Sequence, residues 1–195
     1  MSADNLPLTV ARFPTAMPRG PGYGVQDRMI WREAAADIAT SRREGEKDGR
    51  CIATARFTLE PDGRRVRRLK ANAEARTCGA LDIEANKATG EIPPDFDETV
   101  RRVEARGWAC AAFTTHNHTP DDPRSRWVFP LSAEIPPALP ACEIVADALG
   151  LLGVMDMSKV GAASLFYAPS CPHGARDMHQ TIVVSGAAID AEWVT

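Results

Sequence analysis

The sequence predicts an α+β fold in which helices pack against a mixed or antiparallel sheet. Short apolar segments of strand length recur along the chain, and longer segments between them carry apolar residues at helical spacing. They follow one another as strand, helix, hairpin, helix and strand, an order typical of α+β proteins. The expected helices are residues 26–43, 95–107 and 137–152. The expected strands are residues 51–59, 64–70, 78–84, 108–115, 125–131, 164–168 and 181–184, with a short apolar edge at 154–157.

Length and composition indicate one domain with a substantial core. The chain has 195 residues, of which 44% are hydrophobic, enough for one compact domain and too few for two large ones. Its net charge of −3 gives no overall basic signature of the kind that marks many nucleic-acid binders. An active cleft needs only a local positive stripe, so a nucleic-acid function would depend on local charge.

The cysteines and the apolar runs indicate the compartment. The five cysteines are scattered, odd in number and never spaced as Cys-x-x-Cys, which favours free thiols in a reducing cytoplasm over a disulfide framework. No apolar run approaches membrane-spanning length, and the N-terminus lacks the layout of a signal peptide. We therefore expect a cytoplasmic protein that has no membrane segment.

The first 24 residues are expected to form an N-terminal arm with few regular elements. Four prolines and three glycines interrupt this stretch. Residues 25–195 are then expected to form a single domain. Within it, Pro61-Asp62-Gly63 is a turn that closes the strand at 51–59.

Residues 64–70 are the most basic stretch of the chain. Arg64, Arg65, Arg67, Arg68 and Lys70 fall within these seven positions. One interpretation is a solvated strand face on one side of a hairpin, because basic clusters on exposed strands are common. The other is a track for nucleic-acid phosphates.

The helix expected at residues 95–107 has the clearest boundaries. Asp95, Asp97 and Glu98 favour its N-terminal end, and Gly107 favours its stop. After it, the strands at 108–115 and 125–131 are expected to form a hairpin around a polar turn. Together with the strand at 78–84, this arrangement resembles half of a ferredoxin-like or RRM-like fold.

Asp82 and Glu84 at the end of the strand at 78–84 are candidate metal ligands. Residues two apart in a strand point to the same face, with side chains rooted roughly 6.5 to 7 Å apart. Leu81 and Ile83 face the core, so the two carboxylates can converge on one or two Mg²⁺ or Mn²⁺ ions, which prefer oxygen ligands. The alternative is a strand end entering solvent, where acidic residues are ordinary.

The hairpin at 113–131 gathers histidines and arginines around one turn. His116 and His118 lie in the turn, and Arg124 and Arg126 alternate on the following strand, so both can point to one face. Arginine grips phosphate oxygens bidentately, and histidine can hydrogen-bond a phosphate or act as an acid. The alternatives are turn histidines bonded to nearby backbone, or a transition-metal site built on His-x-His.

Cys171-Pro172-His173 with His179 raises a zinc hypothesis of its own. These residues supply three ligands of the kind that zinc prefers, and Asp177 would be a poor fourth.

Taken together, the motifs resemble the archaeo-eukaryotic primase (AEP) superfamily, most closely its phage- and plasmid-encoded primase-polymerases. The superfamily's acidic D-x-E at a strand end is matched by Asp82 and Glu84. Its small-x-histidine motif is matched by Thr114-Thr115-His116, and its apolar run ending in aspartate by Val154-Met155-Asp156. The resemblance spans roughly residues 47–175, and is strongest over 113–131.

Some positions of this resemblance leave alternatives open. Arg126 or Trp127 aligns with the family histidine if the hairpin is counted differently, and Asp147 is a rival for Asp156. The segment Tyr167-Ala168-Pro169-Ser170 resembles the group's tyrosine-x-proline-serine segment, but the arginine that usually precedes it is replaced by Ser164 or Leu165.

The resemblance implies an AEP-like catalytic core and a two-metal nucleotidyl transfer. Asp82, Glu84 and Asp156 would hold two Mg²⁺ or Mn²⁺ ions. His116 would contact the triphosphate of the incoming nucleotide, helped by His118, Arg124 and Arg126. The partners implied are a single-stranded DNA template, nucleoside triphosphates and a helicase, as an attached domain or a separate protein.

We therefore expect a DNA-dependent primase-polymerase that makes or extends primers during phage or plasmid replication. One alternative is a non-catalytic or degenerate module of the same fold that binds DNA to initiate replication. Another is a metal-dependent nuclease that uses the same carboxylates. No G-x-x-x-x-G-K-[ST] loop is present, so the expected helicase function would lie elsewhere.

Overall fold

The computed structural model contains two five-stranded sheets and describes residues 2–15, 22–40, 43–47 and 49–195. The first sheet has the order β10 (Phe166–Tyr167), β4 (Cys51–Ala53), β1 (Pro7–Phe13), β2 (Tyr23–Ile30), β6 (Arg65–Arg67). The second has the order β12 (Thr181–Val184), β8 (Cys110–Thr114), β9 (Ser125–Ile135), β7 (Ala73–Ile83), β5 (Ala55–Phe57). All pairings within these two sheets are antiparallel, whereas β3 (Arg43–Glu44) and β11 (Ser170–Cys171) form a short parallel pair.

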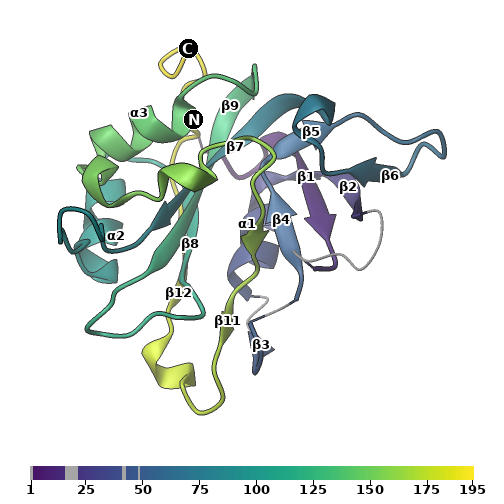
Figure 1. The fold of residues 1–195 in the computed structure, drawn as a ribbon. Helices are drawn as coiled ribbons and strands as arrows, with labels where there is room; N and C mark the ends of the chain where they lie inside the picture. The colour runs from purple at the N-terminus through teal and green to yellow at the C-terminus, as the bar shows by residue number, and fades with distance from the viewer. Residues whose placement is uncertain (1, 16–21, 41–42, 48) are drawn as a thin grey trace.

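Among the described residues, three α-helices and four short 3₁₀ helices complete the fold, and the predicted α+β class is confirmed. The α-helices are α1 (Trp31–Thr40), α2 (Phe96–Ala105) and α3 (Ala141–Ala148). The 3₁₀ helices are η1 (Lys70–Asn72), η2 (Leu152–Val154), η3 (Met157–Lys159) and η4 (Arg176–Met178). In Figure 1, α2 and α3 lie on the outer side of the second sheet, and the first sheet lies on its other side.

Strand β7 separates two hydrophobic cores, because its side chains alternate between the faces of the sheet. Leu81 and Ile83 join Trp127 in the core shared with α2 and α3. Cys78 and Ala80 face the other way, into the core shared with α1 and the first sheet. The charged residues that continue this second face therefore emerge between the two sheets.

Local signals predicted α2 well. Its N-cap is Asp95, whose side chain accepts a hydrogen bond from the Glu98 backbone N–H at 2.6 Å. Gly107 follows the helix with a φ of 67°, a conformation that favours glycine. The predicted strands at 108–115 and 181–184 are also found, as β8 and β12.

The N-terminal part of the chain differs from the prediction. Residues 7–13, placed in an arm, form β1 in the middle of the first sheet. Residues 26–30, placed in a helix, belong to β2, which pairs antiparallel with β1 from Pro7↔Ile30 to Arg12↔Val25. Pairing with a neighbouring strand, which the local pattern does not reveal, decides between strand and helix here. Residues 16–21, also placed in the arm, lie outside the described residues.

The single strand expected at 51–59 is two strands in two different sheets. β4 belongs to the first sheet and β5 to the second, and Thr54 stands between them. The Thr54 carbonyl accepts hydrogen bonds from the backbone N–H and the hydroxyl of Thr77 at 3.0 and 3.2 Å. The chain therefore passes directly from the first sheet to the second at Thr54.

All five cysteines are buried thiols, and none is part of a disulfide bond. Burial raises the pKa of Cys78 and Cys110 to about 12, so both thiols stay protonated at neutral pH. Among the described helices, none has the length and apolar character needed to cross a membrane.

Candidate active site

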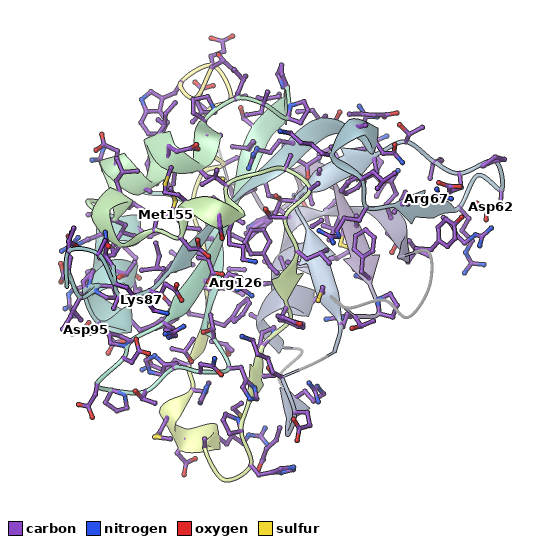
Figure 2. The ribbon with its side chains drawn as sticks, in the orientation of Figure 1. Asp62, Arg67, Lys87, Asp95, Arg126 and Met155 are labelled. Atoms are coloured by element: carbon purple, nitrogen blue, oxygen red, sulfur yellow. The ribbon has the colours of Figure 1, made fainter. Side chains whose placement is uncertain are left out.

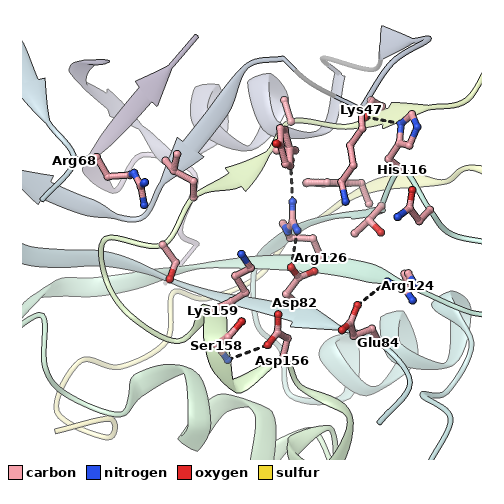
Figure 3. Close-up of a pocket in the computed structure, with 18 residues that line it drawn as sticks. Lys47, Arg68, Asp82, Glu84, His116, Arg124, Arg126, Asp156, Ser158 and Lys159 are labelled. Carbon is pink, nitrogen blue, oxygen red and sulfur yellow. Dashed lines mark hydrogen bonds and ion pairs between the residues drawn. The ribbon is translucent and has the colours of Figure 1, made fainter. Parts of the chain in front are cut away.

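A cleft of about 490 Å³ opens between the two sheets. Its walls come from the ends of β7 and β9, the segments around η3 and β10, and the loop before β4. Figure 2 places Arg126 at the centre of the molecule, whereas Arg67, the last residue of β6, and Asp62, in the turn before that strand, lie at its outer edge. Figure 3 shows the cleft with its acidic and basic side chains.

The predicted acidic pair lies at the mouth of this cleft. Asp82 and Glu84 both line it, and Leu81 and Ile83 are buried on the opposite face of the strand. The strand geometry inferred from the sequence is therefore confirmed at this position.

Asp156 is brought beside the pair by the backbone. The Asp156 N–H donates to the Asp82 carbonyl at 2.8 Å, and the Glu84 N–H donates to the Val154 carbonyl at 3.0 Å. The Asp156 carboxylate accepts a hydrogen bond from the Ser158 N–H at 2.9 Å and caps η3. Its rival Asp147 is exposed on α3 and does not line the cleft, so the structure assembles the three acids that the sequence selected.

Arg126 lies directly opposite Asp82 on the neighbouring strand and pairs with it. Its Nη2 donates to Asp82 Oδ2 at 2.7 Å, and its Nη1 donates to the Tyr167 carbonyl at 3.0 Å. The centre of the guanidinium is 5.1 Å from the Phe166 ring and 5.8 Å from the Phe113 ring. With a side chain 8% exposed, Arg126 is a buried, fixed cation rather than a group reaching into open space.

Arg124 pairs with Glu84 in the same way but nearer to solvent. Its Nη1 donates to Glu84 Oε2 at 2.8 Å, and its Nη2 is 2.9 Å from an oxygen of Asp122. Hydrogen bonding with Asp122 raises the pKa of Arg124, which keeps it charged. Both arginines expected to help a nucleotide are thus engaged with the acids expected to hold metal.

The donor set can be compared with what a divalent ion requires. Three carboxylates on adjoining segments supply the oxygen ligands that Mg²⁺ and Mn²⁺ prefer. Across the ranges described above, no three His, Cys, Asp or Glu side chains already stand in a coordinating group. The residue types of Asp82, Glu84 and Asp156 suit a divalent ion, but their side chains do not stand in a coordinating arrangement, and Asp82 and Glu84 are paired with Arg126 and Arg124.

The two turn histidines separate in space. His116 lines the cleft, with Nδ1 3.1 Å from the Ser170 hydroxyl oxygen. His118, predicted to bind nucleotide beside it, lines a different groove on the far side of the turn. Its Nδ1 accepts a hydrogen bond from the Arg124 N–H at 3.1 Å, which leaves it a role in shaping the turn.

Both histidines are expected to make stability depend on pH. Burial, and then the charge of Lys47, lower the pKa of His116. Burial, and then His179, lower that of His118. The unfolded chain therefore takes up protons first as pH falls below about 6.5, and stability is lost through this range. We expect a falling melting temperature from pH 7 to 5.5, and a flatter profile in a His116→Gln/His118→Gln variant. Parallel profiles for the two proteins would contradict this.

The sequence interpretation missed two lysines that line the cleft. Lys159 follows Asp156 on η3, and Lys47 lies in the loop before β4, across the cleft beside His116 (Figure 3). No ion pair within the described part of the chain involves either lysine, although the Lys47 Nζ lies 5.8 Å from the centre of the Tyr167 ring. An isolated lysine carries no sequence pattern that would mark it as a site residue.

The cleft is positively charged overall. Its lining contains five cations and three carboxylates, a formal charge of +2 with His116 neutral. The cations are Lys47, Arg68, Arg124, Arg126 and Lys159, and the carboxylates are Asp82, Glu84 and Asp156. The local positive charge that the overall composition lacks is therefore present at the site, where it favours an anionic ligand.

The basic stretch at 64–70 continues from one edge of this cleft. Arg68 lines the cleft and donates to the Ala163 carbonyl at 3.4 Å. Beyond it, Arg65 and Arg67 lie over the ring of Tyr23, at 4.6 and 5.1 Å from its centre. Arg65 also pairs with Asp62, and Arg67 lies 3.6 Å from Glu60, so part of the positive charge is balanced locally.

The structure does not bring the proposed zinc ligands together. Cys171 is fully buried, and His173 is exposed with Nδ1 3.7 Å from Glu44. The two ring nitrogens of His179 lie 2.9 and 3.0 Å from the carbonyls of Ala175 and Thr115. These three side chains have separate partners.

Comparison with known proteins adds two findings. The family model described as VapE N-terminal domain matches residues 61–192. Among solved structures, the fold aligns with the AEP domain of the Cyanophage S-2L Primase-Polymerase (PrimPol). The TM-score is 0.48 and the identity 11%, over 94% of this chain and 84% of the other. No curated protein matches the chain.

Proposed function

The chain belongs to the VapE N-terminal domain family, and we propose that it is a primase-polymerase domain that adds nucleotides to a DNA-templated strand. The observation that carries this proposal is the joining of Asp82, Glu84 and Asp156 at one edge of a positively charged cleft. Three carboxylates that line one cleft beside cations supply residue types that can serve both metal ions and the phosphates of a nucleotide.

In this proposal the three acids hold Mg²⁺ or Mn²⁺ at the end of β7. When bound, such ions neutralise charge on the attacking 3′-hydroxyl and on the pyrophosphate leaving group. Lys47, Lys159 and His116 face the same space and bind the triphosphate. Catalysis by these residues is then largely positioning and charge neutralisation.

The other walls of the cleft suit the remaining partners. Arg68 and the basic stretch beyond it offer a path for the phosphates of a single-stranded DNA template. Tyr167 lines the cleft and can contact the nucleotide sugar. A helicase, attached or separate, remains the expected partner in replication.

The first test is nucleotide incorporation on primed and unprimed single-stranded DNA with Mn²⁺ or Mg²⁺. We expect Lys159→Gln to raise the KM for the nucleotide about tenfold, because a hydrogen bond to a charged group contributes about 1.5 kcal/mol. The control is Arg101→Gln, which removes one charge from the exposed face of α2. If the wild-type chain incorporates nothing on any template, the proposal fails.

A non-catalytic DNA-binding module is the second candidate, favoured by the pairing of Asp82 and Glu84 with arginines. This candidate predicts DNA binding that survives EDTA, without nucleotide incorporation. Degradation of labelled single strands would instead indicate a metal-dependent nuclease that uses the same acids.

A further inference from the structure

The two arginines that hold the β7 acids differ in how firmly they are fixed. Arg126 is buried, bonded to the Tyr167 carbonyl and flanked by two aromatic rings. Its Nε is buried and has no hydrogen-bond partner among the described residues. The Arg126 guanidinium therefore donates its hydrogen bonds to Asp82 and to the Tyr167 carbonyl. Moving Arg126 would break its hydrogen bond to the Tyr167 carbonyl and its contacts with the Phe113 and Phe166 rings. We therefore infer that Arg126 stays paired with Asp82.

Asp122 holds the Arg124 guanidinium through Nε and Nη2, at 3.0 and 2.9 Å, so that Nη1 alone bonds Glu84. The Arg124 side chain is 21% exposed, and its two acidic partners, Glu84 and Asp122, are 33% and 44% exposed. Its backbone N–H is anchored separately by His118 Nδ1. The guanidinium can therefore exchange Glu84 for another anion while the chain around it stays in place. Exposed pairs of this kind contribute little stability, so exchange is inexpensive.

The charge of the cleft sets which ligand arrives first. A lining of formal charge +2 attracts a triphosphate and repels a divalent cation. Arginine binds phosphate oxygens through the same planar fork with which it binds carboxylates. A triphosphate in the cleft can therefore take Arg124 from Glu84.

From these contacts we propose that Arg124 and Arg126 hold Glu84 and Asp82 in place of a metal while the cleft is empty. The nucleotide binds before the divalent ion. Arg124 is the exchanging cation, which passes from Glu84 to the triphosphate and so frees a metal ligand. Arg126 is a positioning residue, which keeps one oxygen of Asp82 and fixes the orientation of that carboxylate. This inference rests on the proposed function, because it concerns the same nucleotide and metal.

Its first test is a Mn²⁺ titration of the nucleotide-free protein, followed by electron paramagnetic resonance of the free ion. We expect weak binding by the wild type and about tenfold tighter binding by Arg124→Gln, a change worth about 1.4 kcal/mol. Arg124→Lys keeps the charge and should resemble the wild type more closely than the glutamine variant. Arg101→Gln, which removes an equal charge on α2, should leave the affinity unchanged.

The second test is calorimetric titration with a non-hydrolysable nucleoside triphosphate in EDTA. We expect binding without metal, weakened by Arg124→Gln. Circular dichroism melts check that each variant is folded. The inference is overturned if Arg124→Gln and Arg101→Gln bind Mn²⁺ alike, or if no triphosphate binds without metal. A protein that incorporates nucleotides but fails these tests would contradict the inference alone. One that passes them without incorporating nucleotides would contradict the proposed function alone.

Discussion

Replacing Asp82 by asparagine is expected to lower nucleotide incorporation by about 10³-fold or more. The substitution removes the charge of the carboxylate that Arg126 of β9 contacts, and leaves the backbone hydrogen bond from the Asp156 N–H to the Asp82 carbonyl in place. Metal-assisted charge neutralisation supplies several kcal/mol, and each 1.36 kcal/mol lost is a factor of ten in rate. Single-turnover incorporation with Mn²⁺, at saturating nucleotide, measures the effect.

The same substitution tests whether activity and stability can be separated. Asp82→Asn leaves the buried guanidinium of Arg126 without its carboxylate, at a cost of about 3 kcal/mol in the free energy of unfolding. The double variant Asp82→Asn/Arg126→Gln removes the unpaired charge, so stability should recover in part while activity does not. An asparagine variant that is folded and fully active would refute the role of Asp82 as a catalytic residue.

Arg76 is expected to have the largest effect on stability. Its side chain is buried in β7, where Nη1 contacts Cys142 Sγ at 2.9 Å and Nη2 donates to the Val160 carbonyl at 2.6 Å. Arg76→Ala leaves a cavity and an unpaired carbonyl, which together cost about 4 kcal/mol. Urea denaturation followed by fluorescence measures the loss.

Two further variants identify the source of this effect. Arg76→Met fills much of the same volume without a charge, so it should lose less stability than alanine if packing dominates. Arg56→Gln on β5, where the side chain is about a third exposed, serves as the comparison and should change stability little. Equal losses from Arg76→Ala and Arg56→Gln would show that Arg76 is not a structural tie between β7, α3 and the segment before β10.

The sequence predicted those elements whose signals are local. The Asp95 cap and Gly107 bound α2 as expected, and the apolar run at 78–84 located the second half of β7 and the faces of Leu81 and Ile83. Residues 26–30 were assigned wrongly, because Met29 and Ile30 suit a helix as well as a strand until β1 lies beside them. The run at 51–59 alternates throughout, so nothing in it showed that the chain changes sheets at Thr54.

The candidate site was predictable to the same extent. The carboxylates of β7 and Asp156 end apolar runs, a pattern visible in the sequence. The register that places Arg126 opposite Asp82 is not visible there, so the arginines were assigned to the nucleotide alone. Lys47, in a loop, and Lys159, at the end of η3, are isolated in the sequence, and only the fold brings them to the cleft.

The order of strands in the first sheet shows that the region matched by the family model is smaller than the region needed to form that sheet. The family region begins at residue 61 and contains β10 and β6, the two edge strands of that sheet. The strands between them, β4, β1 and β2, all precede residue 61. A fragment cut to the family region would keep the acids of β7 but lose Lys47 and the sheet that faces them. The earlier residues thus supply Lys47 and the three central strands of the first sheet, which the family region does not contain.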